Sequence, residues 1–147
     1  MKQWPAFNAD GDLPVGLYSA TLEEICRRFG ATPRRAVIAE RLKRIYRLAQ
    51  ATGHLSRFII FGSFITSKSE PRDVDIFLLM EDSFDVRNVS PEARLVFDHG
   101  AAQNSLGASV FWVRRAAALS GEDATISYWQ IKRDRTTRGI VEVIIHD

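Results

Sequence analysis

Two aspartates and a glycine–serine pair are the residues of this chain whose types and spacing could do chemistry. In residues 58–80, FIIFGSFITSKSEPRDVDIFLLM, an apolar run ends in Gly62 and Ser63. Nine residues later, Asp73 and Asp75 open a second apolar run. Side chains two apart on a strand project from the same face, so both carboxylates can point at one spot. Mg²⁺ prefers oxygen ligands and binds through one or two carboxylates plus nucleotide oxygens. The spacing therefore predicts a site for Mg²⁺ or Mn²⁺ at the two aspartates.

The glycine–serine turn before the aspartates suits a phosphate group. Gly62 has no Cβ, so its backbone can approach a ligand closely. Ser63 offers a hydroxyl and a backbone N–H, at a position that could begin a short helix whose positive end faces an anion. Lys68 lies between the turn and the aspartates, where its ammonium could reach a phosphate or stay in solvent. Gly-Ser and Asp-x-Asp also occur as ordinary turns, so the hypothesis depends on their register.

Helix signals precede the first of these strands. Residues 1–20 carry Pro and Gly with little periodicity, which predicts an extended N-terminal arm. Thr21 opens a capping box, and Gly30 ends the helix that follows. A second helix begins at Pro33, and apolar residues at helical spacing continue it as far as Gly53.

The whole pattern predicts an α+β fold, with helices packed on a mixed β-sheet in a single domain of residues 1–147. The aspartates then stand at the entrance of one strand, beside the end of another. The further expected elements are strands 58–61 and 74–80, a helix 90–106, a strand 109–113, a polar loop 120–125, and a hairpin of strands 127–132 and 139–146.

Strand, Gly-Ser, nine residues, Asp-x-Asp and strand form a pattern that resembles the signature of the nucleotidyltransferase superfamily, the DNA polymerase beta-like fold in its minimal form. The resemblance covers roughly residues 55–80. It implies a nucleotidyltransferase-like core in which Gly62 and Ser63 hold the phosphates of an NTP. Asp73 and Asp75 would bind metal and act as catalytic residues. The implied reaction moves a nucleoside monophosphate from the NTP to an acceptor hydroxyl. Minimal transferases of this kind often occur in toxin–antitoxin or phage-defence modules.

Longer stretches of the chain resemble a family of small, poorly characterised bacterial proteins grouped near the nucleotidyltransferases. Its members share an LPxG…ATxxE…RFG leader before the GS…DxD core. The segments that carry this resemblance are LPVGLYSATLEEICRRFG, GSFITSKSEPRDVDI and RGIVEVI. The resemblance implies a fold more firmly than a substrate.

A third carboxylate normally completes the superfamily's site, on the strand after the intervening helix, and residues 109–113 offer none. Glu142 is the best replacement as a catalytic residue, because it lies alone in GIVEVII, where an unpaired charge would be expensive. Its partner could be a metal or an arginine, and an arginine would make it a structural residue. Asp98 is another candidate, although FDHG falls within the expected helix. The adjacent His99 could act as a general base.

Composition limits the class of protein. The 147 residues are 46% hydrophobic and 26% charged, which is ordinary for a soluble globular domain. No apolar run approaches the roughly 18 residues that cross a bilayer, which argues against a membrane partner. A single cysteine, Cys26, excludes an internal disulfide. Together with an N-terminus that lacks the apolar core of a signal peptide, it favours the cytoplasm.

Sixteen arginines against four lysines indicate a phosphate-bearing partner, although a GC-rich genome would have the same effect. Three functions stay open. The first is a nucleotidyltransferase whose acceptor is RNA, a protein or a small molecule. The second is a degenerate, non-catalytic protein of the same fold that binds nucleotide or serves as a protein-interaction or homodimer module. The third is a domain that binds RNA through a basic helix face, namely Arg34, Arg35, Arg41 and Arg47.

Overall fold

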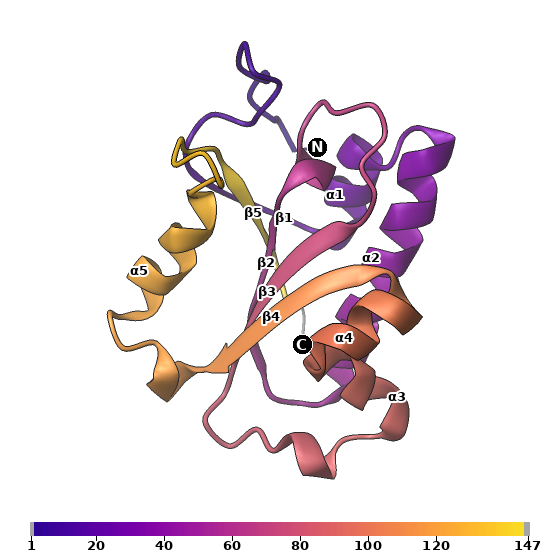
Figure 1. Cartoon of the computed structure of the whole chain (residues 1–147), viewed down its shortest axis with the longest axis vertical. Coiled ribbons are helices and arrows are strands. Elements are labelled where there is room, and N and C mark those ends of the chain that lie inside the picture. Colours follow the sequence, from indigo (N-terminus) through magenta and orange to yellow (C-terminus); the bar gives the residue numbers. More distant parts are fainter. Residues whose placement is uncertain (1, 146–147) are drawn as a thin grey trace.

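The computed structural model describes residues 2–145, and within them the chain forms one mixed five-stranded β-sheet with helices on both faces (Figure 1). The strands are β1 (Leu17–Ala20), β2 (Leu55–Phe61), β3 (Val74–Met80), β4 (Ala108–Arg114) and β5 (Ile140–Val143). The helices are α1 (Leu22–Phe29), α2 (Pro33–Ala51), α3 (Pro91–Arg94), α4 (His99–Ala101) and α5 (Glu122–Ser127). This confirms the predicted α+β arrangement on a mixed sheet.

The sheet has the strand order β1-β5-β2-β3-β4. β2 runs antiparallel to both β3 and β5, while β1 pairs with β5 and β3 with β4 in parallel. The antiparallel β2–β3 pair places the end of β2 beside the start of β3. The glycine–serine turn and the two aspartates therefore meet at one edge of the sheet.

Alternation along the strands sends apolar side chains to two cores. Val74 and Ile76 are fully buried in the larger core, which packs against α1 and α2, as the sequence predicts. Ile59 and Phe77 lie on the opposite face, in a smaller core that Ile126 of α5 covers. Asp75 lies two residues before Phe77 on β3, so the alternation of side chains along the strand directs its carboxylate to this second face, on which α5 lies.

The predicted boundaries of α1 and α2 are confirmed. The Thr21 hydroxyl accepts a hydrogen bond from the Glu24 backbone at 3.1 Å, and the Glu24 carboxylate accepts one from the Thr21 backbone at 2.9 Å. At the start of α2 the Thr32 hydroxyl accepts a hydrogen bond from the Arg35 backbone at 3.2 Å, with Pro33 in the first turn. Among the helices of residues 2–145, none has both the length and the apolar character to span a bilayer.

The expected helix 90–106 is interrupted at Asp98. α3 gives way to a 3-10 turn, and Asp98 then adopts an extended conformation with φ −115° and ψ 113°. Its side chain accepts a hydrogen bond from the Ala101 backbone at 3.0 Å and so caps α4 instead of continuing the first helix. The break places His99 against β4, with its Nδ1 3.2 Å from the Val110 carbonyl oxygen.

The expected strand 127–132 is wrong over residues 127–130, which end α5 and form a 3-10 turn, Tyr128–Gln130. The end of that strand does pair as in a hairpin, because Ile131 forms an isolated antiparallel bridge with Thr137 and the Lys132 backbone N–H donates to the Thr136 carbonyl oxygen. The polar loop expected at 120–125 is helical from its third residue onward. The helical conformation places Ile126 and Trp129, three residues apart, on one face against the sheet. A short apolar run fits either conformation, so the sequence pattern could not decide between them.

The second strand of the expected hairpin forms as β5, and the last residue expected in it, His146, lies outside the described residues. β5 inserts between β1 and β2. The prediction of an extended arm over residues 1–20 therefore needs correction, because its last four residues are β1, a strand of the sheet. Leu13 is also fully buried. The N-terminal segment is part of the fold.

Candidate functional site

Gly62 and Asp75 are in direct contact. Asp75 pairs with Phe61 across β2 and β3, and Gly62 follows at once with φ +82°. A Cβ at Gly62 would lie 1.9 Å from the Asp75 Oδ2 atom. Position 62 therefore requires glycine twice, for its backbone conformation and for the space that the carboxylate occupies. Ser63 then begins a short 3-10 helix.

The two aspartates converge on one spot. The Ser109 hydroxyl donates a hydrogen bond to the Asp73 Oδ2 atom at 3.3 Å, and Ser109 pairs with Asp75 across β3 and β4. Burial, followed by the nearby Asp73 carboxylate, raises the pKa of Asp75 from its ordinary 3.8 to about 6. The Ser109 hydroxyl and the guanidinium groups of Arg138 and Arg133 oppose that rise. The pair thus carries repulsion that a cation would relieve.

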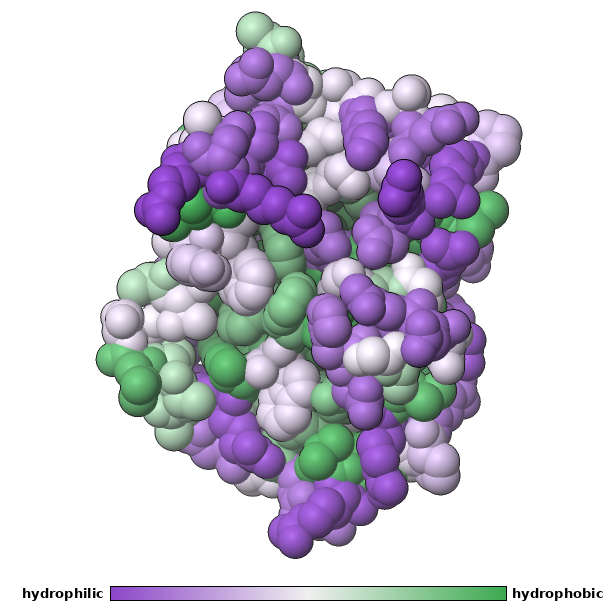
Figure 2. Space-filling view, viewed as in Figure 1, coloured by the Kyte–Doolittle hydropathy of each residue, from purple (hydrophilic) through white to green (hydrophobic). Residues whose placement is uncertain are grey.

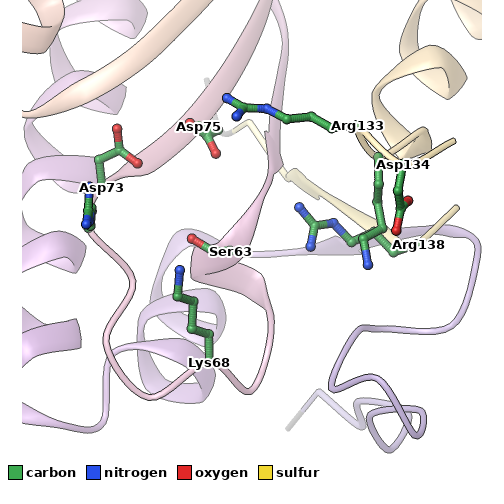
Figure 3. Close-up of a pocket in the computed structure, with 9 residues that line it drawn as sticks. Ser63, Lys68, Asp73, Asp75, Arg133, Asp134 and Arg138 are labelled. Carbon is green, nitrogen blue, oxygen red and sulfur yellow. The ribbon is translucent and has the colours of Figure 1, made fainter. Parts of the chain in front are cut away.

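An open cavity of about 590 Å³ lies in front of these residues. In Figure 3, Asp73, Asp75, Ser63 and Lys68 direct their polar atoms into the same space, and Arg133 and Arg138 enter it from the opposite side. Five of its nine lining residues are basic and three are acidic. The lining residues are Ser63, Lys68, Arg72, Asp73, Asp75, Lys132, Arg133, Asp134 and Arg138. The cavity therefore has the two aspartates on one side and more basic than acidic side chains around it.

Asp12 fixes the positions of two of these basic side chains, Lys132 and Arg138. Its carboxylate is buried and receives the Lys132 ammonium at 3.0 Å and the Arg138 guanidinium at 3.2 Å. The segment before it also supports the turn, since the Ser67 backbone N–H donates to the Gly11 carbonyl at 2.8 Å. Residues far apart in the sequence thus fix the basic side of the cavity relative to the turn.

Arginines of α2 support the loop between the turn and the aspartates. Arg35 is buried, and its guanidinium donates to the carbonyl oxygens of Phe64, Thr66 and Lys68, and to that of Phe29 in α1. Five donors on a rigid planar group suit this arrangement, and a lysine could not reproduce it.

Two neighbours of Arg35 bind the same loop nearer to the aspartates. Arg34 donates to the Pro71 and Arg72 carbonyls at 3.1 Å each, and Arg41 donates to that of Arg72 at 3.4 Å. Three of the four arginines considered for an RNA-binding helix face are therefore engaged with the protein's own backbone. Arg47 is the fourth and is exposed.

A second hollow of about 380 Å³ adjoins the first and shares Asp75, Lys132, Arg133 and Arg138 with it. Aromatic side chains line much of it. Figure 2 shows green and white surface in the hollow between α5 and β4, below the purple side chains of the loop that precedes β5. The remaining lining residues are Phe61, Gly62, His99, Gln103, Ser109, Phe111, Tyr128, Trp129 and Ile131.

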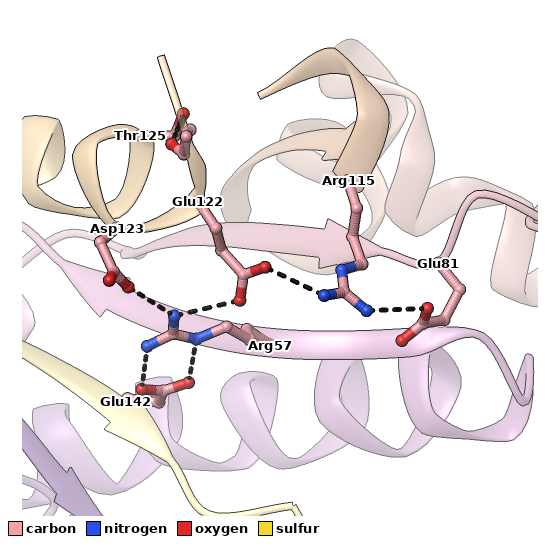
Figure 4. Close-up of polar contacts among 8 residues, drawn as sticks. Arg57, Glu81, Arg115, Glu122, Asp123, Thr125 and Glu142 are labelled. Carbon is pink, nitrogen blue, oxygen red and sulfur yellow. Dashed lines mark hydrogen bonds and ion pairs between the residues drawn. The ribbon is translucent and has the colours of Figure 1, made fainter. Parts of the chain in front are cut away.

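Glu142, expected as a third catalytic acid, does not line either hollow. Its two carboxylate oxygens each accept a hydrogen bond from the Arg57 guanidinium at 2.7 Å, and Arg57 also binds Glu122 at 3.2 Å (Figure 4). Glu142 pairs with Ile59 on β2, on the same sheet face as Asp75 but farther along the strands. Of the two partners considered for Glu142, a metal or an arginine, the structure shows the arginine, so Glu142 is a structural residue. Asp98 caps α4 and lines neither hollow.

The sequence pattern did not predict the basic side of the cavity. Lys132 ended an expected strand, and Arg133 and Arg138 lay between that strand and the next. The run KRDRTTR was the available signal. Asp12 gave none, because its partners lie 120 and 126 residues away. Arg35 resembled its exposed neighbours on α2.

The aspartates fit a divalent cation that takes part of its shell from a ligand. Within residues 2–145, no cluster of three or more His, Cys, Asp or Glu side chains could hold a metal by itself. Mg²⁺ commonly binds through one or two carboxylates and completes its octahedron with water and phosphate oxygens. Metal binding by Asp73 and Asp75 stays a prediction, which their convergence favours.

The fold and the site together define an α+β protein in which an acidic pair faces a basic cavity. The chain belongs to a family of unknown function, DUF6932, which matches residues 5–144. No match was found among curated proteins or among solved structures. The matched range includes Asp12, the turn, the aspartates and β5, so the whole candidate site lies within the family's bounds.

Proposed function

We propose that this protein is a metal-dependent nucleotidyltransferase, which moves a nucleoside monophosphate from an NTP to an acceptor hydroxyl. The observation that carries the proposal is the contact of Gly62 with Asp75, beside Asp73 and in front of a basic cavity. The antiparallel β2–β3 pair, with the turn at one strand's end and the acids at the other's start, is consistent with a nucleotidyltransferase-like core. A toxin–antitoxin or phage-defence setting belongs to the same proposal.

The basic cavity would hold the triphosphate. The Gly62 backbone lies against Asp75, Ser63 lines the cavity directly after it, and Lys68 reaches in from the loop between the turn and the aspartates. Arg133 and Arg138 face them across the cavity, where planar guanidinium groups can bind phosphate oxygens bidentately. These side chains would neutralise the charge that develops on the leaving pyrophosphate, which is the main task in phosphoryl-type transfer.

Asp73 and Asp75 would hold the metal. When bound there, Mg²⁺ or Mn²⁺ would supply positive charge to the phosphate oxygens and orient them. Ser109 occupies the position on β4 next to Asp75, and its hydroxyl orients the Asp73 carboxylate. The protein thus provides two carboxylates and one neutral hydroxyl, that of Ser109, for the predicted metal site.

In the transfer, the acceptor oxygen forms a bond to the α-phosphorus while the bond from that phosphorus to pyrophosphate breaks. Entering and leaving oxygens lie roughly in line. With pyrophosphate in the basic cavity, the attacking oxygen lies on the opposite side of the α-phosphorus, at the border of the adjoining aromatic hollow. His99 lines that hollow, and with its Nδ1 proton directed at the Val110 carbonyl the neutral ring offers Nε2 to receive the acceptor's proton.

One observation favours a second candidate, a non-catalytic nucleotide-binding or protein-interaction module. Ser109 stands on the strand where the resemblance implies a third carboxylate, and Glu142 is paired elsewhere. Such a protein would keep the phosphate cavity and lose the transfer step.

The experiment that separates the two uses each NTP labelled at the α-phosphate, with Mg²⁺ or Mn²⁺ and with total RNA, total protein or small-molecule extracts as acceptors. An enzyme transfers label to one class of acceptor, and Asp75→Asn abolishes the transfer. Asp98→Asn is the matched control, because asparagine also caps a helix and Asp98 lies outside both hollows. Binding of NTP without transfer in every extract would favour the non-catalytic module.

A further inference from the structure

The aromatic hollow beside Asp75 has an unusual floor. The Trp129 ring packs on Phe61 with centroids 4.5 Å apart and on Phe111 at 5.2 Å, with interplanar angles of 33° and 35°. The His99 ring also packs on Phe111, with centroids 4.9 Å apart, and Tyr128 meets Trp129 edge-on at 5.4 Å. Five rings thus form one continuous surface along the hollow.

This floor is open to solvent. Phe111 is 39% exposed and Tyr128 is 62% exposed, while Phe77, the neighbour of Phe111 on β3, is buried against Trp129. Large apolar surface left exposed in a concave site indicates a ligand, because it could otherwise be buried against the core. The volume of about 380 Å³ falls within the range of small-molecule sites.

The hollow is also polar and charged at its border with the phosphate cavity. Lys132, Arg133 and Arg138 line both spaces, so an anion bound in the first lies next to the rings of the second. Beside the acidic pair, the Gln103 amide donates to the Ser109 hydroxyl at 3.3 Å, and Gln103 also lines the hollow. A ligand that fits has a flat ring with polar edges, joined to a phosphate group.

We infer that the aromatic hollow binds a nucleobase, which stacks on the floor of Phe111, Tyr128 and Trp129 while the attached phosphate lies among Lys132, Arg133 and Arg138. Stacking on aromatic rings next to cationic side chains is how proteins hold bases without reading a fixed sequence. Gln103 is one of the few side chains here that could hydrogen-bond the edge of a base. We therefore expect the hollow to discriminate only modestly between the four bases.

Two sources could supply that base, the NTP itself or the terminal nucleoside of a single-stranded acceptor. The inference rests on the proposed function for the identity of the phosphate cavity. Its test uses equilibrium binding in the presence of Mg²⁺, so it does not depend on catalytic turnover. The probes are the four NTPs, inorganic tripolyphosphate and a short single-stranded RNA.

Tyr128→Ala and Phe111→Ala remove the two exposed rings. Loss of one stacking partner lowers base affinity by about 5- to 150-fold. We expect that loss for NTPs, with tripolyphosphate binding unchanged, if the base belongs to the NTP. If it belongs to the acceptor, RNA binding falls and NTP binding stays. Tyr128 is mostly exposed, so its variant retains the fold even if Phe111→Ala does not. Leu119→Ala, at a side chain 93% exposed and outside the hollow, is the matched control.

Trp129 provides a second readout, because a base stacked on the floor quenches its fluorescence and Trp129→Phe removes that quenching. Equal affinities of the wild-type protein and both ring variants for every probe would overturn the inference. Failure to bind any probe would overturn it together with the proposed function. Ring-dependent binding without label transfer would leave the inference standing and remove the transferase activity alone.

Discussion

Neutralising Asp75 should make the protein more stable and less able to bind its ligand. Its pKa is raised to about 6 from an ordinary 3.8, chiefly by burial and then by the Asp73 carboxylate. The ionised carboxylate is therefore less favourable in the folded protein than in the unfolded chain. Asp75→Asn removes that cost, while it also removes the predicted metal ligand.

The magnitude follows from the two pKa values. At about 1.4 kcal/mol per unit, the shift corresponds to roughly 3 kcal/mol at pH 8. Asp75 borders an open cavity, and solvent screening reduces this figure, so we expect a gain of about 1–3 kcal/mol in the free energy of unfolding. For a chain of this length, the gain corresponds to a rise in Tm of roughly 3–10 °C.

The sign and the pH window make the test specific. Below pH 4 Asp75 is protonated in both states, so wild type and Asp75→Asn should have equal stability apart from local effects. As the pH rises from 4 to 6, the carboxylate ionises first in the unfolded chain, and wild type should lose stability relative to the variant. Above pH 6 the difference should be constant. Urea unfolding at intervals between pH 4 and 8 measures it.

A carboxylate whose pKa is shifted in the opposite direction serves as the control. Asp85 has its pKa lowered to about 2 from an ordinary 3.8 by its hydrogen bonds with Arg87, so Asp85→Asn should show the reverse trend. It should lose stability relative to wild type as the pH rises from 2 to 4 and then differ by a constant amount, which urea unfolding extended down to pH 2 measures. An Asp75→Asn variant that is less stable than wild type at pH 8, or a difference that does not change with pH, would refute the assignment of Asp75 as a strained site carboxylate.

Further predictions concern the turn, the loop, the expected third acid and the proton acceptor. Gly62→Ala should weaken NTP binding at least tenfold through its clash with Asp75, whereas Gly53→Ala, with a similar φ of +77° and no atom within 4 Å of its Cβ, should not; calorimetry measures both. Arg35→Lys should cost about 3 kcal/mol or more in urea unfolding, because one ammonium cannot satisfy four carbonyls; a loss below 1 kcal/mol would contradict this. Glu142→Gln should cost about 1–3 kcal/mol through the weakened Arg57 pair and leave NTP affinity unchanged, and the reverse result would return Glu142 to the site. His99→Gln should lower kcat of label transfer by about 10²–10⁴ with NTP affinity unchanged, and an unaltered kcat would exclude the histidine as proton acceptor.

Local signals in the sequence were sufficient for α1, α2, β2, β3 and β4. Caps at Thr21 and Thr32 and the period-2 alternation after Asp73 depend on neighbouring residues only, so they can be read without the fold. The convergence of Asp75 with Gly62 was also expected, since an antiparallel pair brings a strand's end beside its partner's start. Metal and nucleotide binding by these residues stay predictions.

Long-range contacts decided what the sequence could not show. The partner of Glu142 is Arg57, 85 residues earlier, and nothing near GIVEVII distinguishes that pairing from a metal ligand. Residues 127–132 fit a strand or a helical turn equally, and packing of Trp129 on Phe61 and Phe77 accompanies the turn. The bond of Asp12 to Arg138 exists only because β1 and β5 are neighbours.

The position of β5 between β1 and β2 has a consequence for synthesis of the protein on the ribosome. Until residues 140–143 emerge, β1 has no partner in the sheet and β2 has one open edge. Lys132, Arg133 and Arg138, which carry most of the cavity's positive charge, become available at the same late stage. On the proposed function, a nascent chain would therefore be unable to hold a triphosphate before β5 pairs with β1 and β2. A product cut short near residue 130 would combine exposed strand edges with an incomplete cavity.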